Sequence, residues 1–340
     1  MKQYSNKMVL EALGLPMFED IQTLAQETRL TEKLIYFLTK ENANGRYNTF
    51  YIDKSDGTKR QINAPCKSLK ELQRWVLHNI LYRVRVSQYS IGFARNGKGS
   101  PLAQCANRHK NNLYILKMDL KNFFPSIKRG RVYKQFLQLG YNTYASNLLT
   151  NICTLEDSLP QGAVTSPYLA NLICYRMDIR IAGYCNKRDI TYTRYADDLT
   201  FSCDNRDALK NIYHMIKFIV QDEGFSINQK KTQFLTPKVH KKIIGVTVND
   251  GLVKAPKEMK KKVRAMIHSQ IMSGDYSQND RIRGYIAYID SIEKNYRART
   301  ISYIEKYLDY SCMLSPNLVK RFNQNKLYDE IPDMQGGPIN

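Results

Sequence analysis

The sequence predicts an α+β fold, and three observations support this prediction. Two pairs of short runs rich in β-branched and aromatic residues, 47–52 with 59–64 and 190–195 with 199–203, are each joined by a turn, as in antiparallel hairpins. Between these pairs, apolar residues recur at the spacing of amphipathic helices. The last third, 254–310, has a helical pattern throughout and is rich in Lys and Arg.

The elements can be placed in order along the chain. Residues 7–40 are expected to form two helices interrupted at Gly14-Leu15-Pro16, because Gly and Pro break helices. The first hairpin turns at 55–58 and ends at Pro65. Further helices are expected at 69–84, 130–139, 143–153, 167–182 and 208–223, strands at 113–120, 224–235 and 242–249, a Gly-rich loop at 92–99, and a loosely ordered tail at 315–340.

Composition excludes several classes of protein. With 43% hydrophobic and 24% charged residues, the chain of 340 residues is not mainly disordered. No stretch approaches the roughly 20 apolar residues that cross a bilayer, and the N-terminus has no uninterrupted apolar run typical of a secretory signal. The seven cysteines form no CxxC pair, which favours reduced thiols. We therefore expect a cytoplasmic protein with no membrane partner.

The charge indicates the class of partner. Lys and Arg number 52 against 31 Asp and Glu, a formal net charge of +21. Such an excess favours a polyanion, because Lys and Arg that neutralise phosphates release condensed counterions. The alternative is a basic surface that serves only solubility.

Three carboxylates are the candidate chemical centre. Asp119 closes the apolar run 113–120, and Asp197 with Asp198 lies at the tip of the second hairpin. Acids at strand ends in one sheet can hold two divalent ions about 3.5–4 Å apart. Mg²⁺ suits such a site because it prefers hard oxygen ligands. The alternative is structural, since Asp is common in turns.

Motifs around these acids occur in a characteristic order. The chain contains, in sequence, Lys117-Met-Asp-Leu-Lys-Asn-Phe-Phe124, Leu159-Pro-Gln-Gly-Ala-Val-Thr-Ser-Pro167, Tyr195-Ala-Asp-Asp198 and Gly224-Phe-Ser-Ile-Asn-Gln-Lys-Lys-Thr232. Together they resemble the palm of a reverse transcriptase, and 59–65 and 90–95 resemble its two fingers motifs. The resemblance implies a right-hand polymerase with fingers, a palm whose antiparallel sheet packs on helices, and a helical thumb.

This resemblance implies domain boundaries. It divides the chain into N-terminal helices (1–44), fingers (45–112 with part of 128–158), palm (113–127 and 159–250), thumb (251–314) and a C-terminal tail (315–340).

Within that family, the sequence is most similar to bacterial retron reverse transcriptases. The similarity lies in Leu72-Gln-Arg-Trp-Val-Leu77, Ser90-Ile-Gly-Phe93, the Leu-Pro-Gln-Gly-Ala loop and an Arg-Tyr-Ala-Asp-Asp-Leu-Thr hairpin. Two retron patterns are altered. Asn-Ala-x-x-His appears as Cys105-Ala-Asn-Arg-His109, without the first Asn, and Val-Thr-Gly appears as Ile243-Ile-Gly245.

The resemblance also implies residue roles. Asp119 and Asp197 would bridge two Mg²⁺ ions, with Asp198 completing the acidic cluster. Phe124 would exclude a ribose 2′-OH, whereas Phe123 is expected in the core. The other implied nucleotide-binding residues are Arg60, Lys70, Gln161, Gly162 and Lys231, and the implied nucleic-acid-binding residues are Asn107, His109, Tyr195, Lys257, Lys261 and Arg264.

The implied function is RNA-directed DNA polymerisation on a cognate structured non-coding RNA. By family resemblance, the primer is the 2′-OH of a guanosine in that RNA. The product is then a branched RNA–DNA molecule (msDNA), in a system that defends against phages with a separate effector protein. No nuclease pattern is visible, so a host RNase H would degrade the template.

Two alternatives remain at this level. One is a different bacterial reverse transcriptase, related to group II intron or other defence polymerases. The other is an RNA-binding scaffold or antitoxin with incidental catalysis, although such a protein would not require adjacent acids at Asp197 and Asp198.

Overall fold

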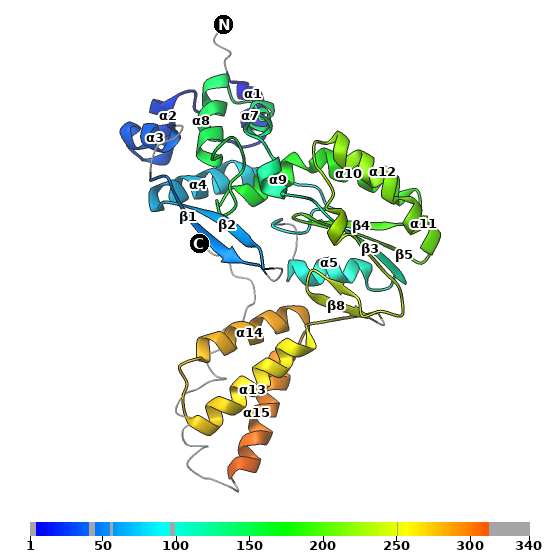
Figure 1. The fold of residues 1–340 in the computed structure, drawn as a ribbon. Coiled ribbons are helices and arrows are strands. Elements are labelled where there is room, and N and C mark those ends of the chain that lie inside the picture. Colours follow the sequence, from blue (N-terminus) through cyan, green and yellow to red (C-terminus); the bar gives the residue numbers. More distant parts are fainter. Residues whose placement is uncertain (1–4, 41–44, 55–56, 96–98, 250, 313–340) are drawn as a thin grey trace. The chain divides into compact units, whose positions relative to one another are not determined.

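The computed structural model describes residues 5–40, 45–54, 57–95, 99–249 and 251–312, with side chains up to residue 306 (Figure 1). Contacts along the chain separate two compact units. Unit 1 comprises Met1–Asn96 and Leu116–Phe234, and unit 2 comprises Gly97–Ile115 and Leu235–Asn340. The α+β class is confirmed by antiparallel hairpins and many helices in the described residues.

Unit 1 begins with three helices, where the sequence pattern predicted two. They are α1 (Lys7–Ala12), α2 (Ile21–Thr28) and α3 (Glu32–Thr39). The second predicted helix is divided because Arg29 adopts a left-handed conformation (φ 56°) that ends α2. The Thr31 side chain then accepts a hydrogen bond from the Leu34 amide and starts α3.

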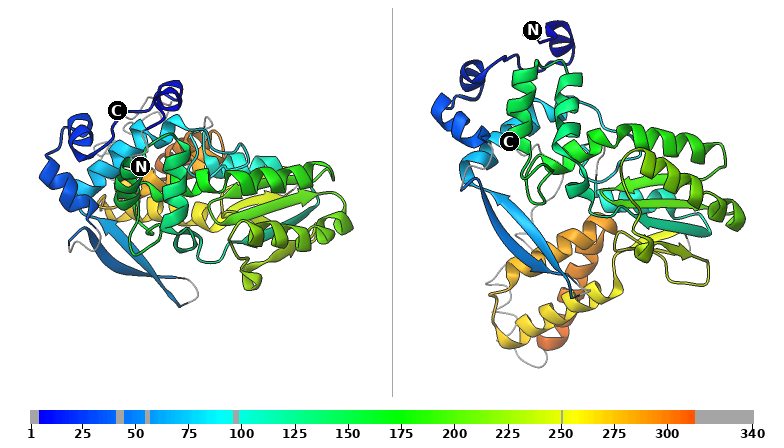
Figure 2. Two further views of the ribbon diagram at one scale, coloured as in Figure 1. Left: turned by 90° about the horizontal axis from the view of Figure 1, so that it is seen from above. Right: turned by 45° about the horizontal axis from the view of Figure 1, so that its top comes forward.

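The first predicted hairpin is confirmed. Strands β1 (Tyr47–Asp53) and β2 (Lys59–Pro65) pair antiparallel, and all of β1 after its first residue is exposed. Both views of Figure 2 show this hairpin extending away from the helices of unit 1. It leads into α4 (Lys67–Asn79), which is shorter than predicted because the chain passes into the 3-10 turn η1 (Leu81–Arg83).

The central helices follow the predicted order with two interruptions. The predictions at 130–139 and 143–153 are confirmed by α7 and α8, whereas 167–182 and 208–223 are each divided, at Cys174 and Ile212. The bounds are α6 (Phe123–Ser126), α7 (Arg129–Gln138), α8 (Thr143–Cys153), α9 (Ser166–Ile173), α10 (Tyr175–Asn186), α11 (Arg206–Asn211) and α12 (Tyr213–Asp222).

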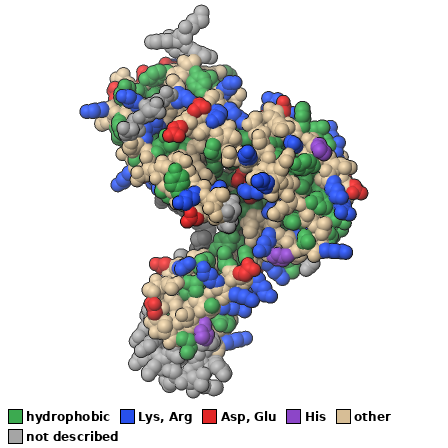
Figure 3. All heavy atoms as spheres, in the orientation of Figure 1, with side chains coloured by type: hydrophobic (Ala, Val, Ile, Leu, Met, Phe, Trp, Pro, Cys, Tyr) green, Lys and Arg blue, Asp and Glu red, His purple; other side chains and the backbone are tan. Residues whose placement is uncertain are grey.

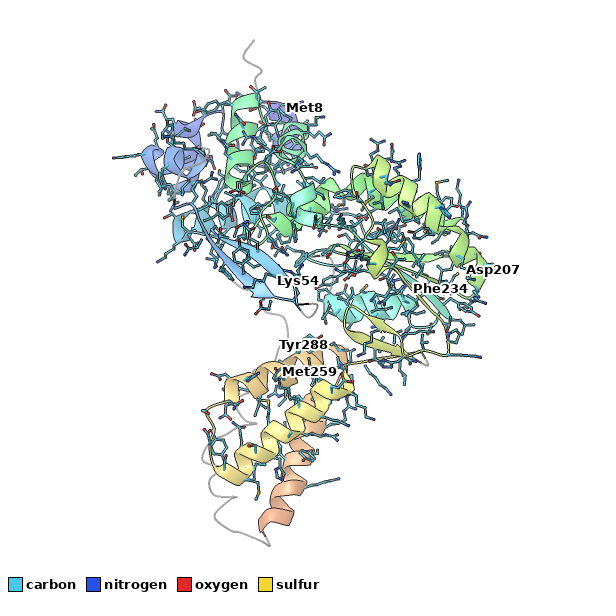
Figure 4. All side chains as sticks on the ribbon, in the orientation of Figure 1. Met8, Lys54, Asp207, Phe234, Met259 and Tyr288 are labelled. Carbon is cyan, nitrogen blue, oxygen red and sulfur yellow. The ribbon has the colours of Figure 1, made fainter. Side chains whose placement is uncertain are left out.

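A four-stranded sheet is the base of the candidate site. Its strands, β3 (Tyr114–Asp119), β4 (Thr191–Tyr195), β5 (Asp198–Cys203) and β6 (Gln233–Leu235), lie in the order β4-β5-β3-β6. Helices α10 and α12 cover one face (Figure 1). The predicted strand 224–235 is wrong except at its end, where Phe234 lies in β6 (Figure 4). Before β6, Ile227 makes only an isolated bridge, and 229–231 form the 3-10 turn η2 (Gln229–Lys231).

Unit 2 combines a small sheet with helices. Helix α5 (Pro101–His109), which the sequence analysis did not predict, packs on the sheet β7 (Lys242–Ile243), β8 (Val246–Asn249) and β9 (Leu252–Lys254). The helical last third is confirmed as α13 (Lys257–Ser273), α14 (Asn279–Ile292) and α15 (Tyr296–Cys312). Figure 4 labels Met259 on α13 and Tyr288 on α14. The unit boundaries differ from the predicted domain boundaries, and the division into fingers, palm and thumb stays a prediction.

The predicted tail 315–340 lies outside the described residues. Among the described helices, none combines the length and apolarity that crossing a membrane requires. Lys and Arg side chains are abundant on the face shown in Figure 3.

Candidate active site

The fold brings the three predicted carboxylates together. Asp119 is the last residue of β3 and is buried, while Asp197 and Asp198 are half-buried at the turn between β4 and β5. The Leu120 amide donates a 2.9 Å hydrogen bond to the Asp197 carbonyl, so the end of β3 is fixed against this turn. Tyr195 pairs with Asp198 in the strand register. Segments nearly 80 residues apart in sequence thus meet at one place, as predicted.

The turn requires an unusual backbone and a close neighbour. Ala196 has a positive φ of 55°, which a non-glycine residue seldom adopts. Gly92 lies against the turn, and a Cβ there would be 3.0 Å from the Tyr195 ring and 3.1 Å from the Ala196 nitrogen. The Asn171 side chain donates to the Gly92 carbonyl at 2.7 Å. The predicted residue Tyr195 also packs on Phe93, with ring centroids 5.9 Å apart.

A buried ion pair supports this turn from inside unit 1. Arg194 and Asp178 are both completely buried, and the Arg194 Nε and Nη2 donate to the two Asp178 carboxylate oxygens at 2.8 and 2.7 Å. The Arg194 Nη1 donates to the Asn171 Oδ1 at 2.9 Å and to the Ala196 carbonyl at 3.2 Å. The Tyr192 hydroxyl donates to Asp178 as well, at 2.9 Å. Arg194 therefore connects the core to the backbone of the turn that carries the acids.

These positioning residues were not predicted from the sequence, where Arg194 is part of the hairpin motif and Asp178 and Asn171 lie in helical segments. One available signal was a charged residue within the apolar run 190–195, because such a residue needs a buried partner.

The electrostatics of the cluster disfavour three charged acids without a cation. Burial raises the pKa of Asp197, and the negative charge of Asp119 raises it further. Burial and the charge of Asp197 raise the pKa of Asp198 to about 6, while Lys117 and Lys231 act in the opposite direction. The Lys231 Nζ donates to the Asp119 Oδ2 at 2.9 Å, and this hydrogen bond raises the pKa of Lys231. The Lys231 ammonium is therefore the counter-charge of the cluster.

The donor set fits Mg²⁺. Within the described residues, no three or more His, Cys, Asp or Glu side chains are gathered closely enough to hold a metal by themselves. Mg²⁺, however, is usually held by one or two carboxylates together with substrate phosphates and water. The ammonium on Asp119 and the raised pKa values of Asp197 and Asp198 both indicate a place where a divalent cation would be stabilised.

The two adjacent phenylalanines have different surroundings. Phe123 is buried and packs on Phe225 at a centroid distance of 6.0 Å, which confirms its predicted place in the core. Phe124 is half-buried, five residues after Asp119 and two after Asn122, whose left-handed backbone (φ 49°) starts α6. Phe124 therefore keeps part of its ring accessible, and its contact with a nucleotide stays a prediction.

The Pro-Gln-Gly loop packs on the first hairpin. The Gln161 carbonyl accepts a 2.8 Å hydrogen bond from the Asn63 amide. Gly162 has φ 120°, and a Cβ there would lie 2.8 Å from the Asn63 carbonyl oxygen. The loop thus needs glycine at 162 for backbone packing. Its predicted nucleotide contact remains a separate hypothesis.

The predicted phosphate-binding cations of unit 1 are exposed. Arg60 lies on β2, close enough to Asp197 that its charge lowers the pKa of that acid. Lys70 is exposed in the first turn of α4. Arg60 thus has the better position for a triphosphate at the acidic cluster.

In unit 2, one predicted RNA contact needs correction. His109 is completely buried, and burial lowers its pKa to about 3, so its ring cannot meet RNA at the surface. It belongs to the face of α5 that packs inward, because Ala106 and Cys105 on the same helix are also buried. Asn107 is exposed, although its side-chain amide donates to the Ala103 carbonyl of its own helix at 2.9 Å.

The predicted basic residues of α13 share one face. Lys257, Lys261 and Arg264 are exposed and line a hollow of about 240 Å³ within unit 2. The acid in this hollow, Glu293, is already engaged by Lys260 at 2.7 Å and by Arg299 at 3.3 Å. Burial acts to raise the pKa of Glu293, but the Lys260 and Arg299 hydrogen bonds and the Ala255 amide lower it overall.

Comparison with known proteins identifies the family. Residues 52–248 match the family model described as reverse transcriptase (RNA-dependent DNA polymerase). The chain is similar to the retron Ec86 reverse transcriptase of Escherichia coli, with 37% identity covering 89% of this chain and 94% of that protein. It is also similar to the retron Mx65 reverse transcriptase of Myxococcus xanthus, with 34% identity covering 82% of this chain and 70% of that protein.

One solved structure shows a more distant similarity. Apo telomerase from Candida tropicalis superposes with a TM-score of 0.48 at 12% identity, covering 85% of this chain and 64% of that one. This similarity is too distant to carry functional information.

An RNA-dependent DNA polymerase takes an RNA template and transfers nucleotides with the help of divalent metal ions. The family match and the retron relatives show that this chain belongs to the reverse transcriptase family, as an RNA-directed DNA polymerase of the retron type.

Proposed function

We propose that Asp119, Asp197 and Asp198 form the catalytic centre of this polymerase and hold two Mg²⁺ ions. The observation that carries the proposal is the convergence of these acids from β3 and from the β4–β5 turn, joined by the hydrogen bond from the Leu120 amide to the Asp197 carbonyl. When bound, the metal ions lower the pKa of the attacking hydroxyl and balance charge on the leaving pyrophosphate.

The side chains around the acids have separate tasks. Lys231 neutralises Asp119 before substrate arrives and is then free to face the triphosphate. Arg60 contacts the triphosphate, because a guanidinium makes charge-assisted hydrogen bonds to phosphate oxygens. Gln161 and Gly162 lie along the incoming nucleotide, and Tyr195 lies along the primer end. Lys70 is a weaker candidate for the triphosphate, because Arg60, and not Lys70, is among the charges that act on the pKa of Asp197.

Substrate choice is assigned to Phe124. Its half-buried ring would clash with a ribose 2′-OH, so deoxynucleotides are accepted on steric grounds. Asn107 and the α13 residues Lys257, Lys261 and Arg264 bind nucleic acid through phosphate and shape.

The wider role that we propose is supported by the similarity to retron enzymes. The enzyme copies a cognate structured non-coding RNA, primes on a 2′-OH of that RNA and leaves branched RNA–DNA. It acts in the cytoplasm as part of an anti-phage system, with a separate effector protein and a host RNase H. The Ec86 and Mx65 relatives, which are named as retron enzymes, support this role.

The test is the nucleic acid that the enzyme makes. The protein is expressed with its flanking locus, purified, and the bound nucleic acid is extracted and treated with RNase and with a 2′,5′-debranching enzyme. The proposal predicts DNA that stays joined to one ribonucleotide after RNase and is released by debranching. Linear DNA that is unaffected by debranching would contradict the retron role. An Asp197→Asn variant that makes as much DNA as the wild type would contradict the catalytic assignment.

A further inference from the structure

A large hollow in unit 1 has no part in the site described above. It has a volume of about 900 Å³ and is lined by residues of α7, α9, α10 and α12, together with 84–85 and 222–224. None of the three catalytic carboxylates lines it. The nucleotide-binding candidates are also absent from its wall.

The wall of this hollow is strongly cationic. Its basic side chains are Arg85, Lys128, Arg131, Lys134 and Arg176. Three of these, Arg85, Lys128 and Lys134, are exposed, and none of the ion pairs among the described residues involves them. Lys128 and Lys134 lie at the start of α7 and on it, and the fold brings Arg85 from an earlier segment to the same wall.

The two acids of the wall do not cancel this charge. The Arg180 Nη1 lies 2.5 Å from both the Asp222 and the Glu223 carboxylates, and the Arg176 Nε lies 3.2 Å from Glu223. Both acids are therefore already engaged by Arg176 and Arg180. Arg85, Lys128 and Lys134 have no such partner among the described residues.

Arg131 adds a further positive charge to the wall. Its Nη1 is buried without a hydrogen-bond partner among the described residues. Its guanidinium carbon lies 4.5 Å from the centre of the Phe225 ring, and burial lowers its pKa. The Arg131 side chain thus forms no ion pair among the described residues, and its charge favours an anion in the hollow.

The size and chemistry of the hollow favour a nucleic-acid backbone over a single small anion. The cations come from three segments, namely residue 85, α7 with its N-cap and α10, as contacts to successive phosphates require. The exposed ring of Tyr175 and the half-buried Ile173 side chain add apolar surface for sugars. Double-stranded RNA is recognised mainly by shape, phosphates and 2′-hydroxyls.

We propose that the hollow between α7, α9, α10 and α12 binds the sugar–phosphate backbone of a folded RNA stem, away from the catalytic acids. This proposal deepens the proposed function, because it rests on a cognate structured RNA as the template. It gives the enzyme a way to hold the folded part of that RNA while the single-stranded part is copied.

The test compares two pairs of charge reversals that change the net charge equally. The test variant is Arg85→Glu with Lys134→Glu, and the control is Lys7→Glu with Lys33→Glu, all four being exposed in the wild type. The probe is a fluorescein-labelled RNA hairpin of about 20 base pairs, measured by anisotropy on the full chain across salt concentrations. Thermal unfolding of both variants checks that they fold.

We expect the test variant to bind the hairpin about tenfold or more weakly than the control, with a slope of log K against log salt less steep by about 2. Equal weakening in both variants would overturn the proposal. A milder variant, Arg85→Gln with Lys134→Gln, should give a salt slope between those of the wild type and the test variant. A salt slope equal to that of the wild type would also overturn the proposal. If inorganic phosphate raises the unfolding temperature of the wild type but not of the test variant, and the test variant still binds the hairpin as the control does, the hollow binds free anions. That result would contradict the proposal.

A second readout separates this proposal from the proposed function. Incorporation of dTTP on poly(rA) primed with oligo(dT) needs no folded stem, so wild type and test variant should be within about twofold of each other. If the wild type incorporates nothing, the catalytic assignment fails, while the hairpin-binding comparison still decides the RNA site.

Discussion

The β4–β5 turn and the basic face of α13 are both expected to act on phosphates, but they are built differently. The turn is fixed by partners from four segments, including a completely buried Arg194–Asp178 pair. On α13, Lys257, Lys261 and Arg264 come from two turns of one helix and are exposed. The comparison indicates that catalysis requires side chains held in fixed positions by the core, whereas binding of a nucleic-acid backbone requires only positive charge near the phosphates. Substitutions at the turn should therefore reduce activity far more than substitutions on α13.

The largest effect is expected from the acids themselves. Asp197→Asn with Asp198→Asn should lower deoxynucleotide incorporation by at least about 1000-fold, because metal-bound charge stabilisation is worth several kcal/mol. Affinity for an RNA hairpin should change little. Incorporation is measured in single-turnover reactions, and RNA affinity is measured by the anisotropy of a labelled hairpin. Asp189→Asn is the control, because Asp189 is exposed. Polymerisation that survives the double change would refute the metal assignment.

The next largest effect tests whether the core positions the turn. Arg194→Met should lower the free energy of unfolding by about 3–5 kcal/mol, because it leaves Asp178 charged and buried without its partner. Urea denaturation measures this loss.

A paired variant separates stability from positioning. Arg194→Met with Asp178→Leu should recover much of the stability, since no unpaired charge remains. Its activity should stay low, because the Ala196 carbonyl has still lost its hydrogen bond from Arg194. A stable and fully active double variant would show that the turn does not need this support.

Two neighbouring rings allow a matched test of substrate choice. Phe124→Ala should reduce the preference for dNTPs over rNTPs by about 100-fold, the scale on which an apolar pocket senses one hydroxyl. Phe123→Ala should instead cost about 3–5 kcal/mol of stability, because Phe123 is buried, and should leave the preference unchanged. The measurement is kcat/KM for dTTP and UTP in both variants, with urea unfolding. The reverse pattern would assign the gate to Phe123.

The raised pKa of Asp198 predicts a pH dependence. Without metal, the charged Asp198 destabilises the folded state above its pKa of about 6, and this penalty disappears as the pH falls toward the ordinary value of 3.8. Asp198→Asn should therefore stabilise the metal-free protein by about 1–3 kcal/mol at pH 8 and hardly at all at pH 4. Urea unfolding in EDTA at both pH values measures this. Mg²⁺ binding to the wild type should weaken below about pH 6, and a flat pH profile would contradict the burial argument.

The smallest effect is expected on α13. Lys257→Ala with Lys261→Ala should weaken binding of an RNA–DNA duplex by about 3–10-fold at 0.15 M salt, through two lost phosphate contacts. The control is Lys7→Ala with Lys33→Ala. If deoxynucleotide incorporation by this variant fell by about 1000-fold, as expected for the Asp197 and Asp198 changes, the distinction between a fixed catalytic site and a basic binding face would fail.

The same contrast explains what the sequence could predict. The acids, the hairpins and the basic helix are local patterns, and a residue such as Asp197 stands out beside a strand. The Arg194 network could not be predicted in this way, because Asp178 and Asn171 lie on other helices and only the fold brings them to the turn.

The errors of the sequence analysis have local causes. His109 was expected to contact RNA because its motif resembled a retron pattern, but its place on the inner face of α5 buries it. The strand predicted at 224–235 failed because apolar residues such as Phe225 and Ile227 are buried beside the sheet without joining it over their full length. Burial alone does not distinguish a strand from an irregular segment in contact with one.

The central claim is that three acids hold two metal ions, and one measurement tests it most directly. The protein is crystallised with an RNA template, a DNA primer ended by a dideoxynucleotide, the next dNTP and Mn²⁺, and anomalous scattering locates the metal. The account predicts two peaks about 3.5–4 Å apart at Asp119, Asp197 and Asp198, with Lys231 no longer bonded to Asp119. A bound dNTP with no metal peak at these carboxylates, and with the Lys231–Asp119 pair intact, would contradict it.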